Sequence, residues 1–158
     1  MVVSSMKKQS KIIVAVLAAL FLAVAAMACV HFATREKVPV NTLAIHAGKD
    51  VVYVDLDKLN RKPVQGTLTN ARGDKIEIDA QGAELADILR MGELDVDSIK
   101  SVTVSAADEY SASLSGAEVN ESEKTFLIFG EDGLQLVVFG DENMKRSVHK
   151  VVSVDVQY

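Results

Sequence analysis

Cysteine is almost absent from this 158-residue chain, and its single copy, Cys29, lies in an apolar segment near the N-terminus. The rest of the chain therefore has no sulfur with which to form a disulfide or a thiolate metal site. Its stability must come from burial of an apolar core. At roughly 100–200 residues per domain, the length allows one compact domain and an appendage.

Residues that would indicate catalysis or metal binding are also scarce. The three histidines, His31, His46 and His149, form no spaced pair, so a transition-metal site is not expected. No G-x-S-x-G elbow surrounds the serines, and no glycine-rich nucleotide loop occurs. Adjacent carboxylates such as Asp108 and Glu109 are typical of solvated turns. The sequence therefore predicts no catalytic residue and no metal ligand.

Positive charge is sparse beyond the first thirty-seven residues. Residues 38–158 hold twelve Lys and Arg against twenty-one Asp and Glu, a net charge of −9. Nucleic-acid affinity comes largely from Lys and Arg that displace counterions, so binding to DNA or RNA is disfavoured. Lys145-Arg146 with His149-Lys150 is the one local cationic cluster. Such a cluster can hold a phosphate or carboxylate, although surface charge runs are more often solvated loops.

An unbroken apolar run, residues 12–30, follows Lys7, Lys8 and Lys11. As a helix its nineteen residues would measure about 28 Å at ~1.5 Å per residue, close to the ~30 Å thickness of the hydrocarbon layer. Cationic residues stay on the cytoplasmic side during insertion. We therefore expect residues 1–30 to target or anchor the chain at a membrane, with the following domain outside the cytoplasm.

Several fates of this segment remain open. Ala26-Met27-Ala28-Cys29 offers an A-x-A spacing directly before a cysteine and resembles a bacterial lipobox, which makes Cys29 a candidate for lipidation. Cleavage with free secretion is a second fate. An uncleaved signal-anchor is the third, and the length of the run favours it. A buried helix of a globular fold is the fourth, which the lack of any polar face disfavours.

The remainder divides into a short connection and one strand-rich domain. Residues 31–48 mix polar, small and apolar types around Pro39, which we interpret as a tether or a peripheral first strand. The domain is expected over residues 49–158. β-branched and aromatic runs bounded by turn residues predict strands at 51–56, 64–69, 75–79, 102–104, 110–114, 125–129, 134–139 and 151–156.

Two turns define hairpins within this pattern. Residues 75–79 alternate charged and apolar types, which places Ile76 and Ile78 on one face of a half-buried strand. The short turn at Gly73 pairs that strand with the preceding one. Residues 131–133, Glu-Asp-Gly, predict a second tight hairpin.

The strand pattern is interrupted by one helix. Leu85, Ile88 and Leu89 recur at three- and four-residue spacing, and Gly92 is placed to end the helix in a left-handed cap. The predicted class is α+β: a strand-dominated, mixed-sheet or barrel-like domain with one clear amphipathic helix.

Four segments of the domain resemble, in order and spacing, the second half of the sulfite-oxidase-type molybdopterin-binding domain: residues 82–89, 102–114, 134–140 and 145–156. In that family a helix headed by a G-x-x-L-x-D-L-L pattern precedes a strand ending in a D-G-Y turn. A closing segment then carries a lysine before the final strand. The resemblance covers residues 64–158 and implies part of that fold.

The departures from the family decide what the resemblance implies for function. Family enzymes bind molybdenum through a cysteine thiolate upstream of the helix, and this chain has no cysteine after Cys29. Lys145 corresponds to the family lysine near the pterin phosphate, and Tyr110 to a structural turn position. Together with Arg146 they form a hypothetical anion or ligand site. The resemblance implies the scaffold more strongly than the cofactor, because function resides in the site.

The sequence thus predicts a membrane-anchored, extracytoplasmic module of the bacterial envelope that is not catalytic and binds a partner protein or a small ligand. No cofactor is predicted. The alternative is an accessory subunit or minimal redox protein that retains a molybdopterin-type cofactor beside a membrane electron-transfer enzyme.

Overall fold

The computed structural model describes residues 16–17, 20–21, 23–24, 26–27 and 41–158. The chain forms two units, Met1–Val38 and Pro39–Tyr158. The described residues of the first unit are helical, and their large apolar side chains are 55–78% exposed. Among the described residues, no helix combines the length and the apolar character needed to cross a membrane. Cys29 and most of the expected leader lie outside the described residues.

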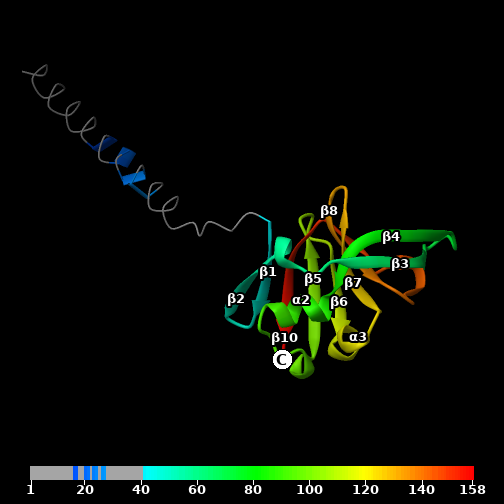
Figure 1. The fold of residues 1–158 in the computed structure, drawn as a ribbon. Helices are drawn as coiled ribbons and strands as arrows, with labels where there is room; N and C mark the ends of the chain where they lie inside the picture. The colour runs from blue at the N-terminus through cyan, green and yellow to red at the C-terminus, as the bar shows by residue number, and fades with distance from the viewer. Residues whose placement is uncertain (1–15, 18–19, 22, 25, 28–40) are drawn as a thin grey trace, which may run out of the picture. The chain divides into compact units, whose positions relative to one another are not determined.

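Strands dominate residues 41–158 (Figure 1). The strands are β1 (Thr42–Ala47), β2 (Asp50–Asp55), β3 (Lys62–Thr69), β4 (Lys75–Glu84), β5 (Ser101–Ala106), β6 (Ser111–Ser115), β7 (Thr125–Gly130), β8 (Gly133–Val138), β9 (Val148–His149) and β10 (Val151–Gln157). The helices are α2 (Leu85–Met91) and α3 (Gly116–Asn120), and the 3₁₀ turns are η1 (Leu56–Lys58), η2 (Val96–Ser98) and η3 (Glu142–Met144).

The strands form two five-stranded sheets. The first has the order β2-β1-β10-β5-β6. It is a mixed sheet, because β1 runs parallel to β10, whereas β1 and β2, and likewise β10 and β5, are antiparallel. The second, β3-β4-β7-β8-β9, is antiparallel. The predicted α+β class, with many strands and one clear amphipathic helix, is confirmed.

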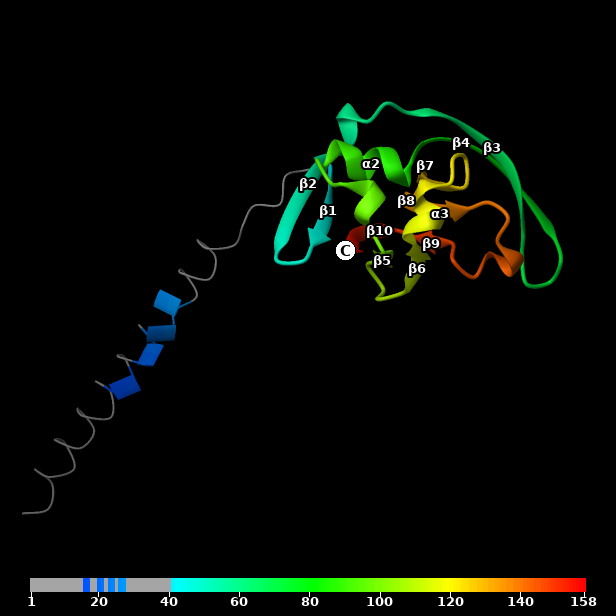
Figure 2. The same cartoon turned by 90° about the horizontal axis from the view of Figure 1, so that it is seen from below.

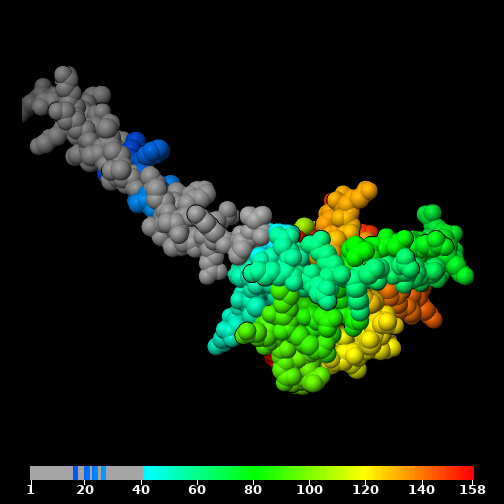
Figure 3. Space-filling model, in the orientation of Figure 1, coloured from blue at the N-terminus to red at the C-terminus, as the bar shows by residue number. Residues whose placement is uncertain are grey.

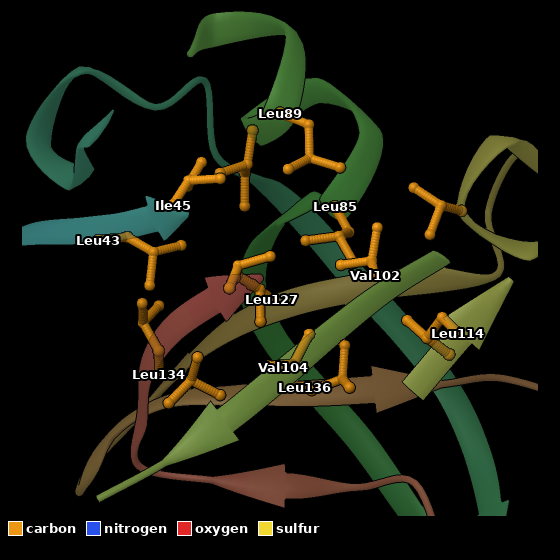
Figure 4. Packing of buried hydrophobic residues seen from close by; sticks show 14 of the residues in the cluster. Leu43, Ile45, Leu85, Leu89, Val102, Val104, Leu114, Leu127, Leu134 and Leu136 are labelled. Carbon is orange, nitrogen blue, oxygen red and sulfur yellow. The ribbon is translucent and has the colours of Figure 1, made fainter. Parts of the chain in front are cut away.

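The main core lies where the two sheets and α2 meet. Alternate residues of β5 point inward, and Val102 and Val104 are fully buried as a period of two requires. Leu85 and Leu89 of α2 reach the same cluster, as does Leu127 of β7 (Figure 4). Burial of these side chains supplies the stability that the missing disulfides cannot.

The boundary of the domain lies earlier in the chain than we expected. Residues 42–47, which we interpreted as part of a tether or as a peripheral first strand, form β1, an interior strand between β2 and β10. Leu43 is 1% exposed and Ile45 is completely buried. β1 forms a hairpin with β2 through the turn at residues 48–49, and it is interior because it also pairs with β10, more than one hundred residues away.

A second apolar cluster lies under the β3–β4 hairpin. β4 pairs with β7 through residues 82–84, and the rest of the hairpin curves away in a long arc (Figure 2). Val64 and Leu68 of β3 pack against Phe126 and Val137, which lie on the face of the second sheet opposite the main core. The second sheet is therefore covered on both faces.

The two predicted hairpin turns are present. Gly73 adopts a positive φ of 86° between β3 and β4, and residues 131–132 connect β7 to β8. Ile76 and Ile78 share one face, since their cross-strand partners are Leu68 and Gly66. Ile78 is half-buried, whereas Ile76, near the tip of the hairpin, is 38% exposed.

The end of α2 differs from the expectation in one residue. Gly92 has a φ of −78°, and the left-handed residue is Glu93, with a φ of 60°. The N–H groups of Glu93 and Leu94 donate to the carbonyls of Arg90 and Leu89, the pattern of a Schellman cap. Gly92 lies close to β2, since a Cβ there would be 3.4 Å from methyl groups of two β2 valines and 3.3 Å from the carbonyl oxygen of Leu89.

Candidate binding groove

Arg146, one of the three residues predicted to form an anion site, is fully engaged by carboxylates. Its Nε and Nη2 donate to Oδ1 of Asp141 at 3.1 and 3.0 Å, and its Nη1 donates to Oε1 of Glu118 at 2.7 Å. These hydrogen bonds raise the pKa of the guanidinium, and the Ser115 N–H together with Arg146 lowers the pKa of Glu118. The side chain joins the segment after β8 to α3, so it does not offer its charge to an anion.

Tyr110 and Lys145 do lie close together, but through the main chain. The Tyr110 hydroxyl donates to the carbonyl oxygen of Lys145 at 2.5 Å. The Lys145 ammonium points to no carboxylate within ion-pair distance in the described part of the chain. Of the three predicted site residues, the structure brings Tyr110 and Lys145 together, and the Lys145 ammonium forms no ion pair among the described residues.

The other half of the cationic cluster lies elsewhere. His149 and Lys150 line a hollow of about 250 Å³ beside the β7–β8 turn, together with Glu131 and Asp132. The charges in this hollow have both signs, so it forms no cationic site. The cluster that is continuous in sequence is therefore divided in space.

A larger feature, which the sequence analysis did not identify, runs along β3. One hollow of about 360 Å³ is lined by residues 62–66, Glu123, Phe126 and Phe139. A second, of about 350 Å³, is lined by Thr67, Thr69 and residues 140–143. Both hollows lie along β3, and their lining residues adjoin in sequence at Gly66–Thr67 and Phe139–Gly140, although no residue lines both. We call their lining residues the β3 groove; Figure 3 shows the hairpin above the segment after β8.

Two phenylalanine rings form an apolar part of the groove. Phe126 and Phe139 meet edge to face, with ring centroids 5.7 Å apart. Gly66 of β3 lies directly against Phe139, and a Cβ at this position would be 2.4 Å from a ring carbon. The glycine therefore allows the strand to approach the ring closely.

The outer edge of β3 carries unpaired main-chain groups. Within the described residues β3 pairs with β4 alone. The N–H of Asn70 donates to the carbonyl of Asp74, and hydrogen-bonded pairs alternate along an antiparallel ladder. Gln65, Thr67 and Thr69 therefore direct their N–H and C=O groups to the open side.

The electrostatics of the groove are acidic. Lys62 donates a hydrogen bond of 2.5 Å to Glu84, which raises the pKa of the lysine, and Asp141 is paired with Arg146. Glu123 and Glu142 are exposed and form no ion pair among the described residues. One carboxylate without an ion pair thus lies beside each hollow, and Glu123 shares the first hollow with Lys62, with which it interacts at longer range.

The sequence does contain one sign of this groove. Pro63 cannot donate to a ladder and is tolerated mainly on edge strands, so it predicts an edge position for residues 62–69. The aromatic wall comes from residues about sixty positions later, which no local pattern connects to β3.

Among the described residues, no group of three or more His, Cys, Asp or Glu is arranged to hold a metal ion. Neither a known protein-family model nor a curated protein sequence matches this chain.

Proposed function

We propose that this chain is a non-catalytic binding module of the cell envelope that holds a partner polypeptide in the β3 groove. The observation that carries the proposal is the combination of a free strand edge and an aromatic wall in one hollow. Ligand sites are usually concave and largely apolar, with a few polar groups that fix orientation. The groove is concave, with an apolar part at Phe139 and a lining that is otherwise mainly polar.

A location at the membrane is part of the proposal. The apolar run of residues 12–30 supports it, as does the exposure of the described apolar side chains in that run. Large exposed apolar surfaces are typical of membrane or protein contacts. The domain would then work outside the cytoplasm, where the lysines before the run place it.

The relation to the molybdopterin-binding fold remains a proposal about ancestry. Glu109 occupies the glycine position of the family's D-G-Y turn and has a φ of 69°, a conformation that glycine adopts without strain. The N–H of Tyr110, the next residue, donates a turn hydrogen bond to Oδ1 of Asp108 at 3.2 Å. If the domain descends from the family, we expect it to retain a divergent form of the D-G-Y turn, and residues 108–110 have this form.

The residues present do not fit the family's cofactor. The sequence lacks the ligand cysteine, and Arg146 is held by two carboxylates. The alternative of a cofactor-bearing redox subunit has only the free Lys145 ammonium in its favour.

Two measurements test the proposal. A photo-crosslinking amino acid at Gln65 or Thr69, in the full chain expressed in its own cells, should form a discrete adduct with a partner polypeptide. The same probe at Ser113 or Asp155, on the outer side of the first sheet, should form none. Adducts of equal intensity at all four positions, or none at any, would contradict the proposal.

Elemental and pterin analysis of the native protein decides between the two functions. The binding module should contain neither molybdenum nor pterin in stoichiometric amount. One equivalent of either would establish the cofactor-bearing alternative.

A further inference from the structure

We infer that the occupant of the β3 groove is an extended polypeptide segment with basic side chains, which joins the second sheet as a strand beside β3. This inference rests on the proposed function and specifies the chemistry of the partner. It combines the main-chain groups, the apolar wall and the charge of the groove.

The unpaired main-chain groups favour a polypeptide over a small molecule. Gln65, Thr67 and Thr69 present N–H and C=O groups at every second residue, and that repeat measures about 7 Å in a strand. Another extended chain offers the same repeat, which is the basis of recognition by strand addition. Pro63 lacks an N–H, so the ladder ends at this residue.

The wall of the groove indicates the central side chain of the partner. Phe126 is only 4% exposed, whereas Phe139 is partly buried and lines the first hollow beside the middle of β3. Side chains of an added strand alternate between two faces. An apolar residue of the partner at this point can contact the exposed part of Phe139 while its neighbours remain in solvent.

The charge of the groove indicates a basic partner. Lys62 and Asp141 are neutralised by Glu84 and Arg146, so Glu123 and Glu142 determine the local charge. These carboxylates lie beside different hollows, one near the start of β3 and one near its end. Basic side chains on either side of the apolar residue would complement them.

The same charges argue against a second copy of this chain. Two copies joined along β3 would bring Glu123 and Glu142 of both copies together, and the domain has a net charge of −9 over residues 38–158. Like charges placed together at an interface oppose association. A partner of opposite charge meets no such repulsion.

Peptide binding to the full chain in detergent micelles, followed by amide chemical shifts, tests the inference. The first probe is a seven-residue peptide with lysine at both ends and alternating threonine and valine between them. The second has glutamate in place of lysine, and the third is the lysine peptide with alternate amides N-methylated. The first should shift the amides of Gln65, Thr67 and Thr69, and the other two should bind at least tenfold more weakly.

Variants of the chain provide matched controls. The double substitution Glu123→Gln with Glu142→Gln should weaken the lysine peptide about tenfold, whereas Glu131→Gln, on the β7–β8 turn, should not. Thr67→Pro removes an outward N–H from the free edge and should abolish binding. Ser113→Pro makes the same kind of change on the edge strand β6 and should leave binding unchanged.

Each other outcome overturns the inference. Equal affinity for the lysine and glutamate peptides would exclude a basic partner but leave the groove as a binding site. Absence of shifts in β3 with every peptide would exclude strand addition. Self-association that Thr67→Pro removes would identify a second copy as the occupant. The photo-crosslinks at Gln65 and Thr69 report on the proposed function independently of these results.

Discussion

Glu118 and Arg146 link α3 to the segment after β8 through a hydrogen bond of 2.7 Å between Oε1 and Nη1. The same carboxylate closes the capping box of α3, since its Oε2 accepts from the N–H and hydroxyl of Ser115. Asp141 holds the other side of the guanidinium. One cation therefore fixes a helix start and the wall of the second hollow of the groove.

Loss of this cation should destabilise the domain. Arg146→Gln leaves Glu118 and Asp141 without their cationic partner, and their side chains are only 26% and 14% exposed. Removing one member of a partly buried charged group typically costs about 1–3 kcal/mol of unfolding free energy. Urea unfolding of Arg146→Gln measures this loss of unfolding free energy. The control is Arg90→Gln, whose pair with Asp87 is more than half exposed and should contribute less than about 0.5 kcal/mol.

The stability should also fall in acid through Glu118. Hydrogen bonds from the Ser115 N–H and from Arg146 lower the pKa of Glu118 from 4.5 to about 2. Its contribution is complete above pH 4.5 and is lost as the pH falls from there to about 2. One pKa unit corresponds to about 1.4 kcal/mol, and solvent screening reduces the total to about 1–2 kcal/mol.

The substitution Glu118→Gln isolates this effect. The variant should be less stable than the parent at pH 6, and the difference in unfolding free energy should shrink as the pH approaches 2. Glu131→Gln, exposed in the β7–β8 turn, should give a curve parallel to that of the parent. A Glu118→Gln curve that is also parallel would show that the carboxylate makes no pH-dependent contribution.

Local patterns were sufficient for most of the fold. Gly73 marked a hairpin because its turn needs a positive φ, and Leu85 and Ile88 marked α2 because their spacing matches a helical face. A first strand before residue 49 was expected only as a peripheral alternative to a tether, and β1 is interior because it pairs with β10 from the opposite end of the chain as well as with β2. Pairings between remote segments leave no mark on the spacing of neighbouring residues.

Glycine 92 and Glu93 illustrate a second limit of local patterns. The turn after α2 needs a left-handed residue at 93, yet the glycine occupies 92, where α2 packs against β2. The close approach of α2 to β2 at this residue is a tertiary contact, which the sequence does not display.

Glu93→Gly should consequently stabilise the domain by about 1 kcal/mol. A left-handed conformation costs an L-residue roughly 1–2 kcal/mol, which glycine avoids. Glycine also raises the conformational entropy of the unfolded chain, and this offsets part of the gain in stability. Thermal unfolding should show a higher midpoint. Glu93→Ala keeps the Cβ and serves as the control, which should give no increase. Equal midpoints for the glycine and alanine variants would contradict the role assigned to φ.

The candidate site was harder to predict than the fold. Lys145 and Arg146 are neighbours in sequence, and the structure gives them different roles because Asp141 and Glu118 bind only the second. The groove joins β3 to Phe139, which is seventy-three positions after Gly66. A charge cluster is visible in a sequence, but the partners that neutralise it are not.

Gly66→Ala should destabilise the domain through Phe139. The new Cβ would lie 2.4 Å from a ring carbon, so the ring must leave its edge-to-face contact with Phe126. Overpacking of this kind typically costs about 1–3 kcal/mol. Urea unfolding of Gly66→Ala measures the loss of unfolding free energy.

A double-mutant cycle assigns that loss to the ring. In the Phe139→Ala background the space beside Gly66 is open, so Gly66→Ala should then cost less than about 0.5 kcal/mol, because the added methyl group meets no ring. An equal cost in both backgrounds would place the conflict in the backbone of β3. Strong coupling between Gly66 and Phe139 would instead establish that the glycine exists to let the strand edge approach the aromatic wall.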